Sequence, residues 1–123
     1  MSHIVQIETQ LRDAEAIAAA CRRLKLAPPV QGTFALYTAQ ANGLAVLLPG
    51  WQYPVVCATA TGQVQYDNFA GHWGDLQELH RFLQAYAVEK TRLEARKRGH
   101  SVTEQVLQDG SIKLSIQLSG GAV

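Results

Sequence analysis

The chain has little charge of either sign, little cysteine and no long apolar run. Among 123 residues, 11 lysines and arginines oppose 10 acidic residues, which leaves a net charge of +1. Such a small net charge creates no global field that would attract DNA or an anionic membrane. No apolar run reaches the ~18 residues of a membrane span, and MSHIVQIETQ lacks the charged and apolar regions of a signal peptide. We therefore expect a cytosolic protein, or one from an equivalent compartment such as a plastid stroma.

Motifs of the common enzyme classes are also missing. No histidine pair has the i, i+4 spacing of a helical zinc site, and no cysteine pair has CxxC spacing. GxGxxG, GxSxG and the P-loop pattern are absent, so the sequence offers neither a phosphate-binding loop nor a nucleophile elbow. Cys21 and Cys57 are expected to be buried, unreactive apolar residues rather than a disulfide. We expect no catalytic residue, metal or cofactor, and hence not an enzyme.

One small pocket is the remaining route to ligand binding or catalysis. His72 and Trp73 fall in the loop NFAGHWG, and His80 lies at the edge of an apolar helical stripe. The favoured interpretation is structural: Asp75 caps a helix, Trp73 packs beside it and His80 is partly buried.

The first two predicted elements are a strand and a helix. Alternation in HIVQIETQL is typical of a strand. Asp13 can then cap a helix that runs to about Lys25, because Pro28 and Pro29 cannot continue it. The predicted apolar stripe of this helix consists of Ala14, Ile17, Cys21 and Leu24.

The middle of the chain predicts three or four antiparallel strands between Thr33 and Asp67. TFALYTA and GLAVLL are apolar runs separated by Asn42 and Gly43, PGWQYP is turn chemistry, and VVCATA leads through a Thr-Gly turn to QVQYD.

A second, longer helix begins at Asp75 and is expected to end at Gly99. The core-facing stripe predicted for it consists of Leu76, Leu79, Phe82, Leu83, Tyr86 and Leu93. A hairpin follows, and its loop can have two or three residues. The three-residue loop 108–110 is favoured, because it pairs Val106 with Ile112 and places the apolar residues of both strands on one face.

The predicted fold is therefore a single α+β domain over residues 1–118, with a disordered tail at 119–123. We expect one mostly antiparallel sheet with both helices packed on one face, in the order strand, helix, meander, helix, hairpin.

Both ends of the chain resemble a small uncharacterised family of cyanobacterial and algal plastid proteins. The matching stretches are MSHIVQIETQLRDAEAI and FLQAYAVEKTRLEARKRGHSVTEQVLQDGSIKLSIQL, about half of the chain. The family is called hypothetical chloroplast reading frame thirty-five. Trp73 also fits its pattern, whereas APPVQGTFALYTAQ does not. The residues that carry the resemblance are Met1-Ser2-His3, Asp13, Tyr86-Ala87, Arg98-Gly99 and Asp109-Gly110-Ser111-Ile112.

The resemblance implies no activity, since none is established for the family. Relatives in other bacteria are often associated with AAA-type ATPases. This implies an accessory role beside such an ATPase, or in a photosynthesis-related complex.

The stretch EKTRLEARKRGH is the most basic part of the chain. Residues 81–100 carry six basic and two acidic side chains, whereas the remainder carries five basic and eight acidic ones. A solvated helix end is the first interpretation, because cations in a last turn interact favourably with the helix dipole. The second is a protein contact at Lys90, Leu93 and Lys97, if the last two turns project from the body. The third is a nucleic-acid contact through Arg81, Arg92, Arg96, Lys97 and Arg98.

Trp51 and Tyr53 in PGWQYP are the other interaction candidates. Aromatic side chains at a hairpin tip either fold back onto the sheet or form exposed binding anchors. Our leading functional hypothesis is a protein-interaction module, with an RNA- or DNA-associated protein as the alternative. Nucleic-acid binding is less favoured, because no aromatic residue follows Tyr86 in the basic segment.

Overall fold

The computed structural model describes residues 5–7, 10–37, 39–67 and 74–118 of the chain. The predicted tail, His72 and Trp73 lie outside these residues. The elements follow in the order β1 (Val5–Ile7), α1 (Ala14–Arg23), β2 (Val30–Ala35), β3 (Gln40–Val46), β4 (Val55–Ala58), β5 (Gln63–Tyr66), α2 (Leu76–Lys97), β6 (Ser101–Val106) and β7 (Ile112–Gln117).

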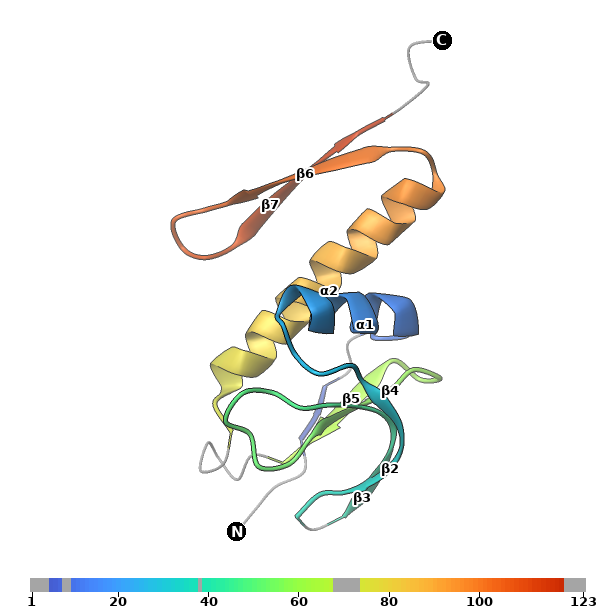
Figure 1. Ribbon diagram of the computed structural model, residues 1–123, viewed down its shortest axis with the longest axis vertical. Helices are drawn as coiled ribbons and strands as arrows, with labels where there is room; N and C mark the ends of the chain where they lie inside the picture. The colour runs from blue at the N-terminus through green and yellow to red at the C-terminus, as the bar shows by residue number, and fades with distance from the viewer. Residues whose placement is uncertain (1–4, 8–9, 38, 68–73, 119–123) are drawn as a thin grey trace.

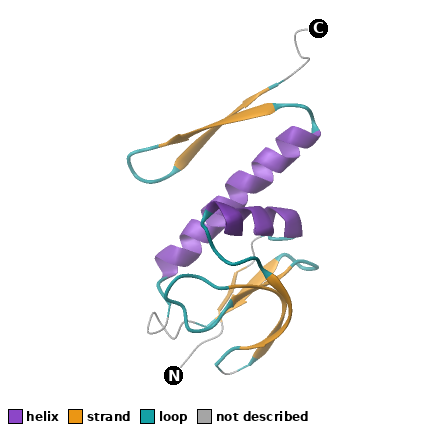
Figure 2. Ribbon diagram, in the orientation of Figure 1, coloured by secondary structure: helices purple, strands orange, loops and turns teal. Residues whose placement is uncertain are grey.

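The strands form two separate sheets, with the helices between them (Figures 1 and 2). Five antiparallel strands lie in the order β1-β5-β4-β3-β2, and β6 pairs only with β7 among the described strands. The α+β class, the two helices and the mostly antiparallel main sheet are confirmed, but the prediction of one sheet is wrong. Helix α2 has 22 residues and spans roughly 33 Å, so it carries the chain past the end of the main sheet before the hairpin begins.

Helix α1 begins where its capping residue predicts. The Asp13 carboxylate accepts hydrogen bonds from the backbone N–H groups of Glu15 (3.0 Å) and Ala16 (3.2 Å). The helix ends at Arg23, two residues earlier than expected, and Lys25 has a positive φ of 59°. Ala14 is exposed, contrary to the predicted stripe, because it is the first helical residue. The buried side of α1 is formed by Ala16, Ile17, Ala19, Ala20 and Cys21.

Asn42 and Gly43 lie inside β3, which corrects the prediction that they separate two strands. They oppose Thr33 and Gly32 of β2. A Cβ atom added to Gly43 would lie 2.4 Å from the carbonyl oxygen of Cys57. Glycine is therefore used here for a close approach between β3 and β4, and not for a turn.

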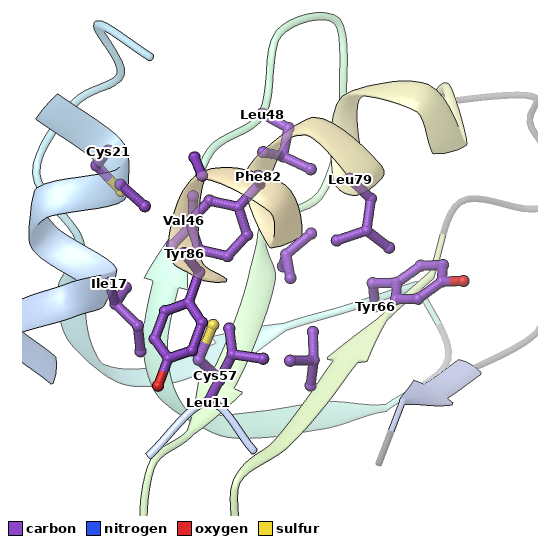
Figure 3. Close-up of a cluster of buried hydrophobic side chains, with 14 of the residues drawn as sticks. Leu11, Ile17, Cys21, Val46, Leu48, Cys57, Tyr66, Leu79, Phe82 and Tyr86 are labelled. Carbon is purple, nitrogen blue, oxygen red and sulfur yellow. The ribbon is translucent and has the colours of Figure 1, made fainter. Parts of the chain in front are cut away.

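The main core lies between the inner face of the five-stranded sheet and the two helices (Figure 3). Phe82 and Leu79 from α2 and Ile17 from α1 are fully buried against the sheet. The Tyr86 hydroxyl donates a hydrogen bond to the Gln10 carbonyl at 3.1 Å and accepts one from the Asp13 N–H at 3.3 Å. These bonds fix the start of α1 against the middle of α2.

Two residues of the predicted α2 stripe region behave differently from expectation. Leu76 is exposed because it is the first residue of the helix. His80 is exposed rather than partly buried, so the suggested pocket does not gain an enclosed histidine from α2. The helix ends at Lys97, close to the predicted stop at Gly99, which has a φ of 75°.

The register of the β6–β7 hairpin is as predicted. Val106 opposes Ile112, and Val102 opposes Ile116. The Leu107 N–H donates to the Ser111 carbonyl at 2.8 Å, which closes a three-residue loop. Gly110, with a φ of 87°, takes the left-handed position of that loop.

Candidate protein-interaction surfaces

Two basic side chains in the second half of α2, Lys90 and Arg92, are paired with carboxylates within the protein. The Lys90 ammonium lies 3.0 Å from a carboxylate oxygen of Asp13 and 2.9 Å from one of Glu94. These hydrogen bonds raise the pKa of Lys90, and the Lys90 bond lowers the pKa of Glu94. Lys90 therefore joins α2 to the start of α1, which is a structural use of its charge.

A second group of charges joins α1, α2 and β6. Arg23 donates to Glu89 (3.0 Å) and to Glu104, and Arg92 also donates to Glu104 at 2.9 Å. The hydrogen bond from Arg23 is the largest cause of the lowered pKa of Glu104. The side chains that form the ion pairs with Glu104 are only 22–35% exposed. The electrostatic attraction within these pairs is therefore screened less by salt than that of pairs on the open surface. Arg92 thus fastens the hairpin to α2.

Four of the predicted cationic contact residues remain exposed. Arg81 lies 3.4 Å from Glu78 and Lys97 lies 3.8 Å from Glu94, both as weak surface pairs along α2. Within the described residues, Arg96 and Arg98 have no ion pair inside 4.0 Å. The cationic surface at the helix end is therefore formed mainly by Arg96, Lys97 and Arg98.

Leu93 does not form an exposed apolar patch between two lysines. It is half-buried and packs against the main core cluster. The hairpin lies alongside the second half of α2 (Figure 1), so the last two turns do not project alone as expected.

Trp51 folds back onto the sheet and is only 8% exposed. Its indole N–H donates a hydrogen bond to the carbonyl oxygen of Asp75 at 3.0 Å. Its ring meets Tyr66 edge-on, with centroids 5.5 Å apart. Tyr53 is half-buried and lies edge-on to the exposed Tyr37, with centroids 6.4 Å apart. Of the predicted aromatic pair, only Tyr53 retains surface for a partner.

The outer face of the five-stranded sheet carries an apolar surface that the sequence analysis missed. Val30 of β2 is directly opposed to Ala45 of β3, which is in turn opposed to Val56 of β4, so these three side chains lie together on the outer face. Val30 and Leu47 are each 58% exposed. We call the apolar pocket of about 310 Å³ on this face the outer pocket, and it is lined by Ala27, Pro28, Val30, Phe34, Ala45, Leu47 and Pro54.

A sequence signal for the outer pocket did exist. GLAVLL and VVCATA are continuous apolar runs instead of alternating ones, which is typical of strands with apolar contacts on both faces. The helices cover only the inner face in the described structure.

The β6–β7 hairpin is the second partly covered apolar surface. Val102, Val106, Ile112, Leu114 and Ile116 share one face, because they occupy directly opposed pairs or alternate positions. Val106 is 71% exposed near the loop, and Ile116 is 49% exposed near the other end. Val102, Ile112 and Leu114 are half-buried, so this face is covered only in part.

Neither a metal centre nor a membrane span is found among the described residues. No group of three or more His, Cys, Asp or Glu side chains could hold a metal ion there. No described helix is long and apolar enough to cross a membrane.

Comparisons with protein-family models, curated proteins and solved structures give no match. The family resemblance and the expected compartment therefore stay predictions.

Proposed function

We propose that this protein is a non-catalytic interaction module that binds an extended segment of another protein at the β2 edge. The observation that supports this most directly is the outer pocket, which lies beside an edge strand. β2 forms one end of the strand order β1-β5-β4-β3-β2, so one side of its backbone has no strand partner in the described structure. An edge strand offers N–H and C=O groups to an incoming strand.

The side chains beside that edge define the kind of segment that fits. Val30, Gly32 and Phe34 alternate along β2 on the outer face. Alternate residues of an added strand would lie next to them. All seven residues that line the outer pocket are uncharged and apolar, so a charged side chain would lose its hydration without gaining a partner. The preferred segment has apolar residues at every second position. An AAA-type ATPase, which the family resemblance suggests, is one candidate source.

A peptide-display experiment tests this proposal. Random twelve-residue peptides are selected on the wild-type protein, and the selected peptides are then titrated against variants. We expect an alternating apolar consensus and at least a tenfold affinity loss for Leu47→Asp, since an unpaired buried charge costs ~2 kcal/mol or more. Val106→Asp is the matched control, because it places the same charge on an exposed apolar residue of the hairpin. Equal affinity of the Leu47→Asp and Val106→Asp variants would contradict the proposal.

Nucleic-acid binding is supported only by the three exposed cations at the end of α2. Lys90 and Arg92 already bind carboxylates of this chain. We expect a single-stranded RNA of about 20 nucleotides to bind weakly and to dissociate at moderate salt. Tight and steeply salt-dependent binding that is lost in an Arg96→Gln, Arg98→Gln variant would favour the alternative function.

A further inference from the structure

The outward edge of β7 is another strand edge without a partner in the described structure. The hairpin has two strands, and in the described structure β7 pairs on one side with β6 alone. A two-stranded sheet is marginally stable without further strands or a packed helix. Helix α2 supports part of this one, yet Ile116 and the adjoining Leu118 remain 49% and 68% exposed.

The β7 sequence has a symmetric pattern. Residues 112–118 read IKLSIQL, in which apolar and polar residues alternate identically in both directions from Ser115. If two such strands run antiparallel with Ser115 opposite its own copy, Leu114 faces Ile116 and Ile112 faces Leu118. Lys113 then faces Gln117, so the two lysines are not opposed. All apolar pairs fall on one face, which the register of a half-buried sheet requires.

The edge of β6 does not have this property. Aligning Val102 with Val106 of a second copy would place Glu104 directly opposite its own copy. Like charges opposed across strands are destabilising. In addition, Glu104 is already bound by Arg23 and Arg92. The charge pattern therefore favours β7 over β6 as the self-pairing edge.

A pocket beneath the β7 edge provides space for the added strand's side chains. This pocket of about 350 Å³ lies between α2 and the end of the hairpin. On the α2 side it is lined by Thr91 and Ala95 and by the charged side chains of Lys90, Glu94 and Arg98. Ile116 and Leu118 line the hairpin side, with His100 in the connection. In the alignment about Ser115, Leu114 and Ile112 of the second copy lie next to Ile116 and Leu118. Their side chains share the face directed at this pocket.

We infer that two copies of this chain associate through β7, with β7 extended by one residue, to form a four-stranded sheet in the order β6-β7-β7′-β6′. The contact has twofold symmetry, so each copy supplies the same surface and the assembly closes as a dimer. It uses a different surface from the outer pocket, so either proposal can fail while the other stands.

The mass in solution is the first test. Light scattering over a concentration series is expected to show a dimer for the wild-type protein. An Ile116→Lys, Leu118→Lys variant is expected to be a monomer, because each lysine would enter an apolar pair. Val106→Lys is the matched control, as it charges an exposed apolar residue on the same face but on β6, and it should remain a dimer. A wild-type monomer at concentrations up to about 1 mM would overturn the inference.

Disulfide trapping tests the register. Ser115→Cys places a thiol on the twofold axis, where mild oxidation should link two chains. Thr103→Cys is the matched control, because Thr103 opposes Ser115 within the hairpin and shares its exposed face. In the order β6-β7-β7′-β6′ the two thiols of the control variant lie three strand spacings apart, about 14 Å, and should not link. Equal linking of both variants, or none, would refute the β7 alignment even if a dimer forms.

Discussion

Gly74→Ala is expected to destabilise the protein through a single contact with Trp51. A Cβ atom added to Gly74 would lie 2.6 Å from the indole ring. The ring cannot move away easily, because its N–H is bonded to the Asp75 carbonyl and its edge contacts Tyr66. Overpacking a well-packed site costs about 1–3 kcal/mol. We expect a loss of this size in the free energy of unfolding.

The loss of unfolding free energy caused by Gly74→Ala should depend on the presence of Trp51. A double-mutant cycle measures this dependence. In a Trp51→Ala background the added methyl group meets no ring. Gly74→Ala should then be neutral, or stabilising by about 0.4–1 kcal/mol through the entropy of the unfolded chain. Urea unfolding followed by far-ultraviolet circular dichroism gives all four free energies.

Gly110→Ala is the control for this cycle. No atom lies within 4 Å of a Cβ atom at that position, and its φ is 87°. Its cost comes from backbone strain alone and should be the same with or without Trp51. If Gly74→Ala also lowers the free energy of unfolding equally in both backgrounds, the clash between the new methyl group and the indole ring is not the cause of the destabilisation.

Three further changes probe the charges, the thiols and the sheet. Glu104→Gln should lower the free energy of unfolding by about 1–2 kcal/mol near pH 7. Because the folded pKa of Glu104 is lowered from 4.5, the difference between variant and wild type should vanish as the pH falls through the folded pKa. A difference that persists at pH 2 would contradict the ion-pair account. Burial raises the pKa of Cys57 to about 12 and also raises that of Cys21. An aromatic disulfide reagent at pH 8 should therefore label neither thiol until urea is added. Rapid labelling of the folded protein would contradict this expectation. Gly43→Ala should lower the free energy of unfolding by more than about 3 kcal/mol, above the usual overpacking range of about 1–3 kcal/mol. The reason is that the new methyl group would lie 2.4 Å from the Cys57 carbonyl oxygen. An unchanged melting temperature would show that β3 and β4 can separate.

Local patterns predicted the elements that depend on neighbouring residues. The period of the apolar residues located both helices, and Asp13 and Asp75 act as the expected caps. The hairpin register followed from the requirement that Val106 and Ile112 share a face. In each case the controlling interactions lie within a few residues or across one tight loop.

Long-range contacts were not predictable from the sequence alone. Lys90 was one of the expected protein-contact residues, yet its ammonium binds Asp13, which is 77 positions away. Asn42-Gly43 resembles a hairpin turn, yet Gly43 is needed where the Cys57 carbonyl approaches β3. The continuous apolar runs indicated an apolar outer face, but the outer pocket also depends on long-range pairing, since it gathers residues from the segment before β2, from β2 and β3, and from the turn before β4.

Backbone hydrogen exchange with a selected peptide tests the central claim most directly. The proposed function predicts that the peptide slows amide exchange along β2, from Val30 to Ala35, because edge N–H groups become bonded to the added strand. Exchange in the last turn of α2 should be unchanged. Protection at the end of α2 or at β7, with none along β2, would contradict the claim that the β2 edge and the outer pocket bind the partner.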